Sequence, residues 1–136
     1  MAETGPERQE NQDGYLVRIQ KVLEMRRKKL LAGGADRIDA QHARGKMTAR
    51  ERIDRLLDKD TFQEIDAYML HRHHDFGMDQ RRYLGDGVTG GFGKIDGRMV
   101  CVYAQDFTIM GGSFGEVAGK KIVKLMEMAM QAGTPV

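Results

Sequence analysis

Apolar residues recur at helical spacing in the first half of the chain. Within residues 15–32 they are Leu16, Ile19, Leu23 and Leu30. This spacing predicts a helix that stops at the glycine pair 33–34. A second helix is predicted over 48–58, where Thr48 and Glu51 spell a capping box in which each residue satisfies the backbone N–H of the other. A short helical turn is expected between them, ending at Gly45.

The pattern changes to strands after Asp60. The run FQEIDAY at 62–68 is typical of a short strand, and the polar, His-rich stretch 69–87 indicates a long connection. Two further strand-like runs, 88–95 and 98–105, are joined by Asp96-Gly97. This dipeptide tolerates the positive φ angles of a type I′ turn, so we predict an antiparallel hairpin.

A third amphipathic helix is predicted over 115–132, with Gly133 as its stop. The last three residues, 134–136, begin another apolar run. A strand, a tight turn, a helix and the start of a strand make most of a βαβ unit whose second parallel strand is missing. We therefore expect the chain to be a piece of a longer protein.

Composition narrows the function classes. The chain has 136 residues, 40% of them hydrophobic, and a formal net charge of +2, which is far from the excess of a dedicated nucleic-acid binder. No stretch is long and apolar enough to suggest a membrane span, and the polar residues 1–14 suit a disordered tail better than a signal peptide. A cytoplasmic location is the default expectation. Cys101 lies in an apolar run and is expected to be a buried thiol.

The stretch GGSFG at 111–115 has the spelling of a hydrolase nucleophile elbow. Such a site needs a histidine and an acid, but all four histidines precede Ser113 and no Asp follows it. The phosphate-loop pattern also fails, because no Gly-Lys-Ser/Thr follows. What remains is a turn of small residues at a helix N-terminus, whose unpaired N–H groups would suit an oxyanion.

The stretch HRHHD at 71–75 gathers zinc-ligand types, but neither a second cluster nor i, i+4 spacing completes a tetrahedral site. We therefore predict a polar loop and no metal in this chain.

Two blocks of the chain, 41–66 (QHARGKMTARERIDRLLDKDTFQEID) and 86–136, carry a family resemblance. They resemble the N-terminal part of the carboxyltransferase (beta) subunits of biotin-dependent acyl-CoA carboxylases. That family includes propionyl-CoA carboxylase β chains, methylmalonyl-CoA and glutaconyl-CoA decarboxylase subunits, and transcarboxylase.

The resemblance implies an α/β fold of the crotonase-like kind, a β-β-α superhelix repeated in two halves. This chain would hold only the opening part of the first half. The implied division is a disordered tail at 1–14, an N-terminal helical segment at 15–60, and an incomplete crotonase-like domain at 61–136.

The resemblance also implies the chemistry, a carboxyl transfer from carboxybiotin to an acyl-CoA, either propionyl-CoA or acetyl-CoA. Biotin would be held by a separate carrier domain or subunit, and the ureido nitrogen would act as the base. Implied partners are a biotin carboxylase, the biotin carrier and further copies of the full-length subunit. A decarboxylase subunit of a biotin-dependent sodium pump and a non-catalytic binding or assembly fragment stay open. The fragment alone is expected to be inactive.

By position in the crotonase fold, Gly111, Gly112 and Ser113 are the candidates for the neighbourhood of the acyl-CoA thioester and its oxyanion. The resemblance also implies a further oxyanion-type Gly-Gly beyond Val136. Arg44 and Lys46 flank a flexible glycine just before a helix and could meet CoA phosphates, with structural salt bridges an equal alternative.

Overall fold

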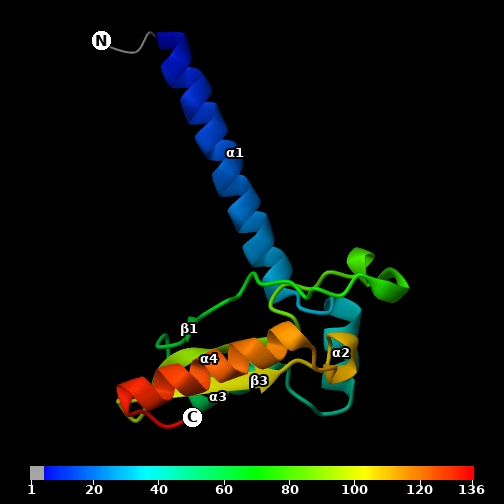
Figure 1. Cartoon of the computed structure of the whole chain (residues 1–136), viewed down its shortest axis with the longest axis vertical. Helices are drawn as coiled ribbons and strands as arrows, with labels where there is room; N and C mark the ends of the chain where they lie inside the picture. The colour runs from blue at the N-terminus through cyan, green and yellow to red at the C-terminus, as the bar shows by residue number, and fades with distance from the viewer. Residues whose placement is uncertain (1–4) are drawn as a thin grey trace.

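The structure, a computed structural model, describes residues 5–136, with side chains described from Gly14 onward (Figure 1). In chain order its elements are α1 (Gly5–Leu30), α2 (Ala35–Ala43), α3 (Ala49–Leu56), β1 (Gln63–Glu64), the 3-10 helix η1 (Asp75–Gln80), β2 (Val88–Ile95), β3 (Arg98–Gln105), the 3-10 helix η2 (Met110–Gly112) and α4 (Glu116–Ala132). The predicted helices and the predicted hairpin are all present.

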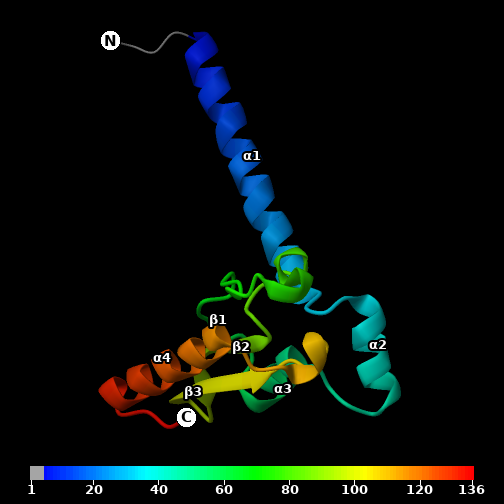
Figure 2. The same ribbon diagram turned by 45° about the vertical axis from the view of Figure 1, so that its right-hand side comes forward.

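Helix α1 projects away from the rest of the molecule in both ribbon views (Figures 1 and 2). It begins at Gly5, so the predicted start at Tyr15 is wrong. Residues 7–12 are mostly Glu, Arg and Gln, which favour helix, and Pro6 stands in the first turn where a helix tolerates proline. The expected tail over 1–14 overlaps α1 from Gly5 onward, and its first four residues lie outside the described part of the chain.

Helix α3 begins with the predicted capping box. The Glu51 N–H donates to Thr48 Oγ1 over 3.3 Å, and the Thr48 N–H donates to Glu51 Oε2 over 2.7 Å. The helix ends at Leu56, two residues earlier than predicted. Ile53 and Leu57 are buried against the sheet.

The sheet has the order β1-β2-β3, and both pairings are antiparallel. Its main part is the predicted hairpin, in which Val88 pairs with Gln105 at one end and Ile95 with Arg98 at the other. The turn residues Asp96 and Gly97 have φ values of 49° and 78°. The strand predicted at 62–68 is reduced to the two residues of β1.

Helices α3 and α4 cover opposite faces of the hairpin. Val100 and Ala104 of β3 share a buried cluster with α3, whereas Cys101 shares one with Leu125 and Ala129 of α4. This division follows from the alternation of side chains along a strand. Cys101 is a buried thiol, as its apolar neighbours predict.

Glycines of β2 allow both helices to approach closely. A Cβ atom on Gly90 would lie 2.6 Å from Leu125 Cδ1 of α4, and one on Gly93 would lie 2.6 Å from Leu57 Cδ1. Both distances are shorter than side chains can tolerate, so each leucine rests directly on the strand backbone.

Strand β3 forms one edge of the sheet. Along this edge the Cys101 N–H donates to the Pro135 carbonyl over 2.9 Å, so the segment after α4 returns alongside β3. A groove of about 760 Å³ runs beside it, lined in part by Val100, Tyr103 and Val136. The return of the chain to β3 after α4 agrees with the predicted βαβ arrangement.

Candidate functional site

The turn after β3 contains the glycines predicted to lie near the thioester. Met110, Gly111 and Gly112 have successive positive φ angles of 47°, 64° and 80°. The Gly112 N–H donates to the Ile109 carbonyl over 3.0 Å, and the Ser113 N–H donates to the Met110 carbonyl over 3.2 Å. The expectation of unpaired N–H groups therefore does not hold for Gly112 and Ser113, because the tight turn uses them itself. Their place beside a thioester stays a prediction.

A side chain of the protein itself binds the N-terminus of α4. Asp86, in the turn before β2, accepts the Ala118 N–H with Oδ2 over 2.9 Å. The N-cap residue Gly115 leaves room for this contact, since a Cβ there would lie 3.3 Å from Asp86 Oδ2 and 3.4 Å from His73 Nε2. A carboxylate at this position interacts favourably with the helix dipole. The Asp86 carboxylate therefore stands where the sequence predicted a bound oxyanion.

Arg44 lies near the glycine turn. A cavity of about 390 Å³ separates α2 from the turn. Its lining residues are Arg37, Ala40, Gln41, Arg44, Phe107, Thr108, Met110 and Gly111. The structure thus brings together one predicted phosphate contact, Arg44, and one predicted thioester neighbour, Gly111.

Lys46 lines a second, adjacent cavity of about 400 Å³. Arg52 of α3 lines it too, and Phe107 and Gln41 line both cavities. From Gly14 onward, Arg44 and Lys46 take part in no salt bridge with another described side chain. The salt-bridge alternative is therefore not seen among these side chains, and contact with CoA phosphates stays a prediction.

Sequence reasoning missed Arg37 and Phe107. The Arg37 Nη1 donates to the Thr108 carbonyl over 3.1 Å and to the Tyr83 hydroxyl over 3.3 Å, and its guanidinium carbon lies 5.9 Å from the centre of the Tyr83 ring. Arg37 precedes Arg44, the residue that follows α2, by seven residues or about two helical turns, so the sequence spacing already indicates that they lie on one side. No local pattern marks Phe107.

A buried cluster of charges holds the turn that carries Asp86. Lys121 of α4 is 1% exposed and donates through Nζ to the carbonyls of Gly85 and Val88. Burial, with a smaller contribution from the ammonium of Lys29, lowers the pKa of Lys121 to about 8. Lys29, at the end of α1, pairs with Glu64 over 3.2 Å. This cluster joins α1, β1 and α4 around the start of β2.

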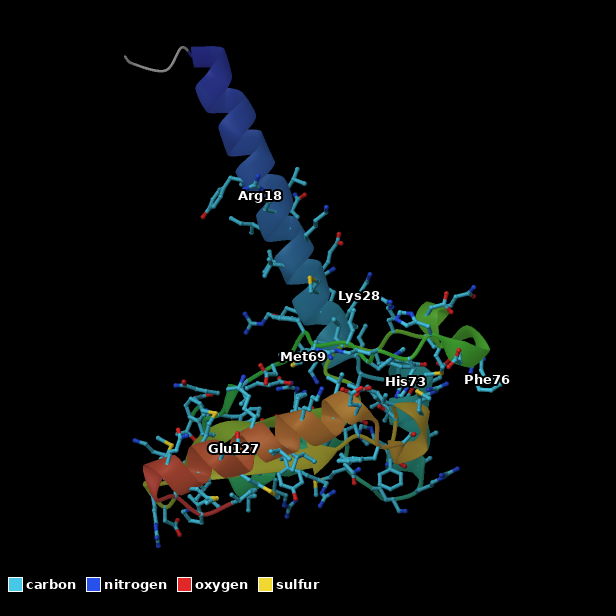
Figure 3. The ribbon with its side chains drawn as sticks, viewed as in Figure 1. Arg18, Lys28, Met69, His73, Phe76 and Glu127 are labelled. Atoms are coloured by element: carbon cyan, nitrogen blue, oxygen red, sulfur yellow. The ribbon has the colours of Figure 1, made fainter. Side chains whose placement is uncertain are left out.

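The HRHHD stretch folds as a loop that leads into η1 (Figure 3). His71 is buried and pairs through Nε2 with the Arg81 carbonyl over 2.9 Å, and its ring stacks 5.9 Å from the ring of His73. Within the described residues, no group of three or more His, Cys, Asp or Glu side chains is placed to hold a metal ion. No helix among residues 5–136 is long and apolar enough to cross a membrane.

Known proteins resemble most of this chain in sequence and in fold. The family described as "Carboxyl transferase domain" matches residues 40–136. A propionyl-CoA carboxylase carboxyltransferase subunit from Haloferax mediterranei is 54% identical over 119 residues, which is 88% of this chain and 23% of the relative. The alpha subunit of methylmalonyl-CoA decarboxylase from Veillonella parvula is 44% identical over 125 residues, or 89% of this chain and 25% of that protein.

Among solved structures, transcarboxylase 12S, described as a hexamer with methylmalonyl-coenzyme A bound, superposes with a TM-score of 0.84 at 46% identity, covering 87% of this chain and 23% of the other. The chain belongs to the carboxyl transferase domain family, and its fold is that of the crotonase-like carboxyltransferases. It spans about a quarter of the length of these relatives.

Proposed function

We propose that this chain is the opening part of a cytoplasmic carboxyltransferase subunit that moves a carboxyl group from carboxybiotin to an acyl-CoA, with propionyl-CoA or acetyl-CoA as acceptor. The family match and the 54% identity to a propionyl-CoA carboxylase subunit support this proposal. In it, α1, α2 and α3 form the N-terminal helical segment, and residues 61–136 are the first part of a crotonase-like domain. The other partners are a biotin carboxylase, a biotin carrier and further copies of the subunit.

The observation that carries the proposal is the pair of cavities on either side of Phe107. Arg37 and Arg44 line one, and Lys46 and Arg52 line the other. Guanidinium and ammonium groups bind phosphates, and an exposed aromatic ring offers a stacking face to an adenine. A coenzyme A carries both chemical features, so these cavities suit its nucleotide end.

The same residues match CoA better than carboxybiotin, because carboxybiotin carries one carboxylate whereas CoA carries several phosphate charges for the four cations. Carboxybiotin supplies the carboxyl group and the base when its carrier docks. The residues of this chain are proposed to hold the acyl-CoA in place, with its nucleotide at the cations and its thioester toward the turn at Gly111. Orientation of this kind contributes to catalysis without any acid or base from the protein. For the chain by itself we expect no turnover.

The test measures carboxyl transfer in a mixture of the intact subunit, a biotin carboxylase and a charged carrier. It compares two acceptors, propionyl-CoA and dephospho-propionyl-CoA. We expect the Arg44→Ala and Lys46→Ala variants to raise the KM for propionyl-CoA about tenfold each, with kcat little changed, because each removes a phosphate contact made equally in the ground and transition states. Dephospho-propionyl-CoA, which lacks the 3′-phosphate, should show a smaller response to at least one of them. Arg18→Ala is the matched control, since Arg18 lies on α1 away from both cavities (Figure 3).

An unchanged KM in both variants would contradict the assignment of the cavities. Absence of any carboxyl transfer to propionyl-CoA or acetyl-CoA, with a carrier shown to be charged, would contradict the proposed reaction.

A second candidate is the decarboxylase half-reaction, in which an acyl-CoA gives up its carboxyl group to biotin. The 44% identity to a methylmalonyl-CoA decarboxylase subunit over 125 residues supports this second candidate. One enzyme catalyses this half-reaction in both directions, so the two candidates differ in what drives the whole assembly. ATP-dependent carboxylation of propionyl-CoA by the full assembly would favour the carboxylase, whereas sodium-coupled release of CO₂ from methylmalonyl-CoA without ATP would favour the decarboxylase.

A further inference from the structure

Asp106 is a buried carboxylate at the end of β3. It is 5% exposed, and its Oδ1 accepts the Thr108 N–H over 2.9 Å and the Thr108 hydroxyl over 2.6 Å. Among the described side chains, no lysine, arginine or histidine forms a salt bridge with it. Burial of a carboxylate is costly, and here its partners all belong to a residue two positions later. The arrangement therefore fixes the backbone between residues 106 and 108.

Thr108 connects this carboxylate to the helical segment. Its hydroxyl donates to Asp106 and accepts the Gly33 N–H over 3.1 Å, while its carbonyl accepts Arg37 Nη1. A Cβ on Gly33 would lie 1.9 Å from the Thr108 oxygen, so only glycine permits this approach. The link between α1 and α2 thus rests directly on Thr108.

Phe107 lies between these two anchored residues and is forced outward, 61% exposed. Its ring covers Gly112, where a Cβ would lie 3.3 Å from two of the ring carbons. The Ile109 N–H donates to the Asp106 carbonyl over 3.1 Å, which starts the turn that follows. That turn includes Met110 at a φ of 47°, a strained conformation that persists only when its surroundings fix it.

From these contacts we propose that Asp106 is a positioning residue for acyl-CoA. It locks Thr108, and through Thr108 it sets Phe107 over Gly112 and Arg37 at the wall of the same cavity. The assignment of the cavity to acyl-CoA rests on the proposed function above, whereas the locking of the turn does not.

The kinetic test uses Thr108→Val in the intact subunit, because valine keeps the shape of threonine and removes the hydroxyl. We expect the KM for propionyl-CoA to rise about tenfold and the KM for the charged carrier to change less than twofold. Thr108→Ser, which keeps the hydroxyl, should stay within about twofold of the parent in both. Asp106→Ala should reproduce the selective rise in KM, and equal losses toward both substrates would overturn the proposal in favour of a general structural role.

A double-mutant cycle tests whether the effect passes through the aromatic ring. If Asp106 acts by placing Phe107, Phe107→Ala should raise the KM for propionyl-CoA, and adding Thr108→Val should change it little further. If the two substitutions raise the KM for propionyl-CoA independently, so that their fold-changes multiply, the route through Phe107 is contradicted.

The locking of the turn is measured separately, without substrate. The 136 residues contain no tryptophan, so Phe107→Trp adds one indole fluorophore at this turn, and the fluorescence of the parent subunit is subtracted as background. Adding Thr108→Val should increase quenching of this indole by acrylamide, and adding Thr108→Ser should not. Unchanged quenching would overturn the positioning role. Increased quenching in a protein that uses no acyl-CoA would overturn the proposed function alone.

Discussion

The two ends of β3 carry turns built in different ways. At the hairpin end, Asp96 and Gly97 have positive φ angles, and both of their N–H groups donate to the carboxylate of Asp58, over 3.0 and 2.8 Å. At the other end, Met110 to Gly112 have positive φ angles, and the preceding residues are held by the buried carboxylate of Asp106.

The difference lies in what determines each turn. The hairpin needs only two adjacent residues that tolerate left-handed φ, and its acceptor Asp58 reinforces it from the surface. The turn after β3 depends on Gly33 and Arg37, which are 75 and 71 residues away from Thr108 in sequence. A turn held by distant contacts can present a side chain at a fixed place, and Phe107 is the side chain presented here.

The largest expected effect comes from breaking the turn after β3. Gly112→Val should lower turnover of the intact subunit on the order of a hundredfold, because displacing this turn would misplace the thioester that it is proposed to orient. Valine would be strained at a φ of 80° and would press on the Phe107 ring. Ser113→Ala should keep most of the activity, because the side chain is exposed and the proposed role needs only the backbone. Steady-state kinetics of both variants would decide, and an inactive alanine variant beside an active valine variant would restore Ser113 as a nucleophile.

Breaking the hairpin turn should affect stability alone. Asp58→Ala removes the acceptor of two backbone N–H groups, so we expect the free energy of unfolding to fall by about 1.5 kcal/mol. Urea denaturation would measure the loss. Asp58→Asn, which keeps one carbonyl acceptor, should lose less. A raised KM for acyl-CoA in either variant would mean that the two ends of β3 are coupled.

The smallest effect is expected at a cap that belongs to neither turn. Thr48→Ala should lower the free energy of unfolding by about 1 kcal/mol through loss of the α3 capping box. Hydrogen bonding from the Thr48 N–H also lowers the pKa of Glu51. That contribution is present above the ordinary carboxyl pKa and is lost as the pH falls through the lowered value. Thermal melts at pH 7 would test the prediction, and equal melting temperatures would remove the capping box as a source of stability.

Local signals made much of the fold predictable. The capping box, the Asp96-Gly97 turn and the terminal Gly133 each act within a few residues, so the starts and ends of α3, the hairpin and α4 follow from the sequence nearly as observed. The start of α1 did not follow, because a polar composition suits both a solvated helix and a tail. β1 is short although the sequence suggested a longer strand.

The candidate site was only partly predictable, because most of its contacts join residues that are far apart in the sequence. Arg44 stood out beside a flexible glycine, and its position at a cavity with Gly111 joins two sequence-based candidates. The pairing of Asp86 with the N-terminus of α4 could not be read locally, since Ala118 is 32 residues away. A longer separation hid the proposed role of Asp106, because the contact of Thr108 with Gly33 joins residues that are 75 positions apart.

The bare backbone of β2 has a consequence for how the sequence can vary. Leu125 and Leu57 press on Gly90 and Gly93 from opposite faces, so residue sizes at these paired positions are tied together across the sheet. An alanine at 90 would be accommodated only beside a smaller residue at 125, and the same holds for 93 with 57. In evolutionary terms the order of change is one-sided: a smaller residue can replace the leucine first, whereas a larger residue can replace the glycine only after, or together with, that change.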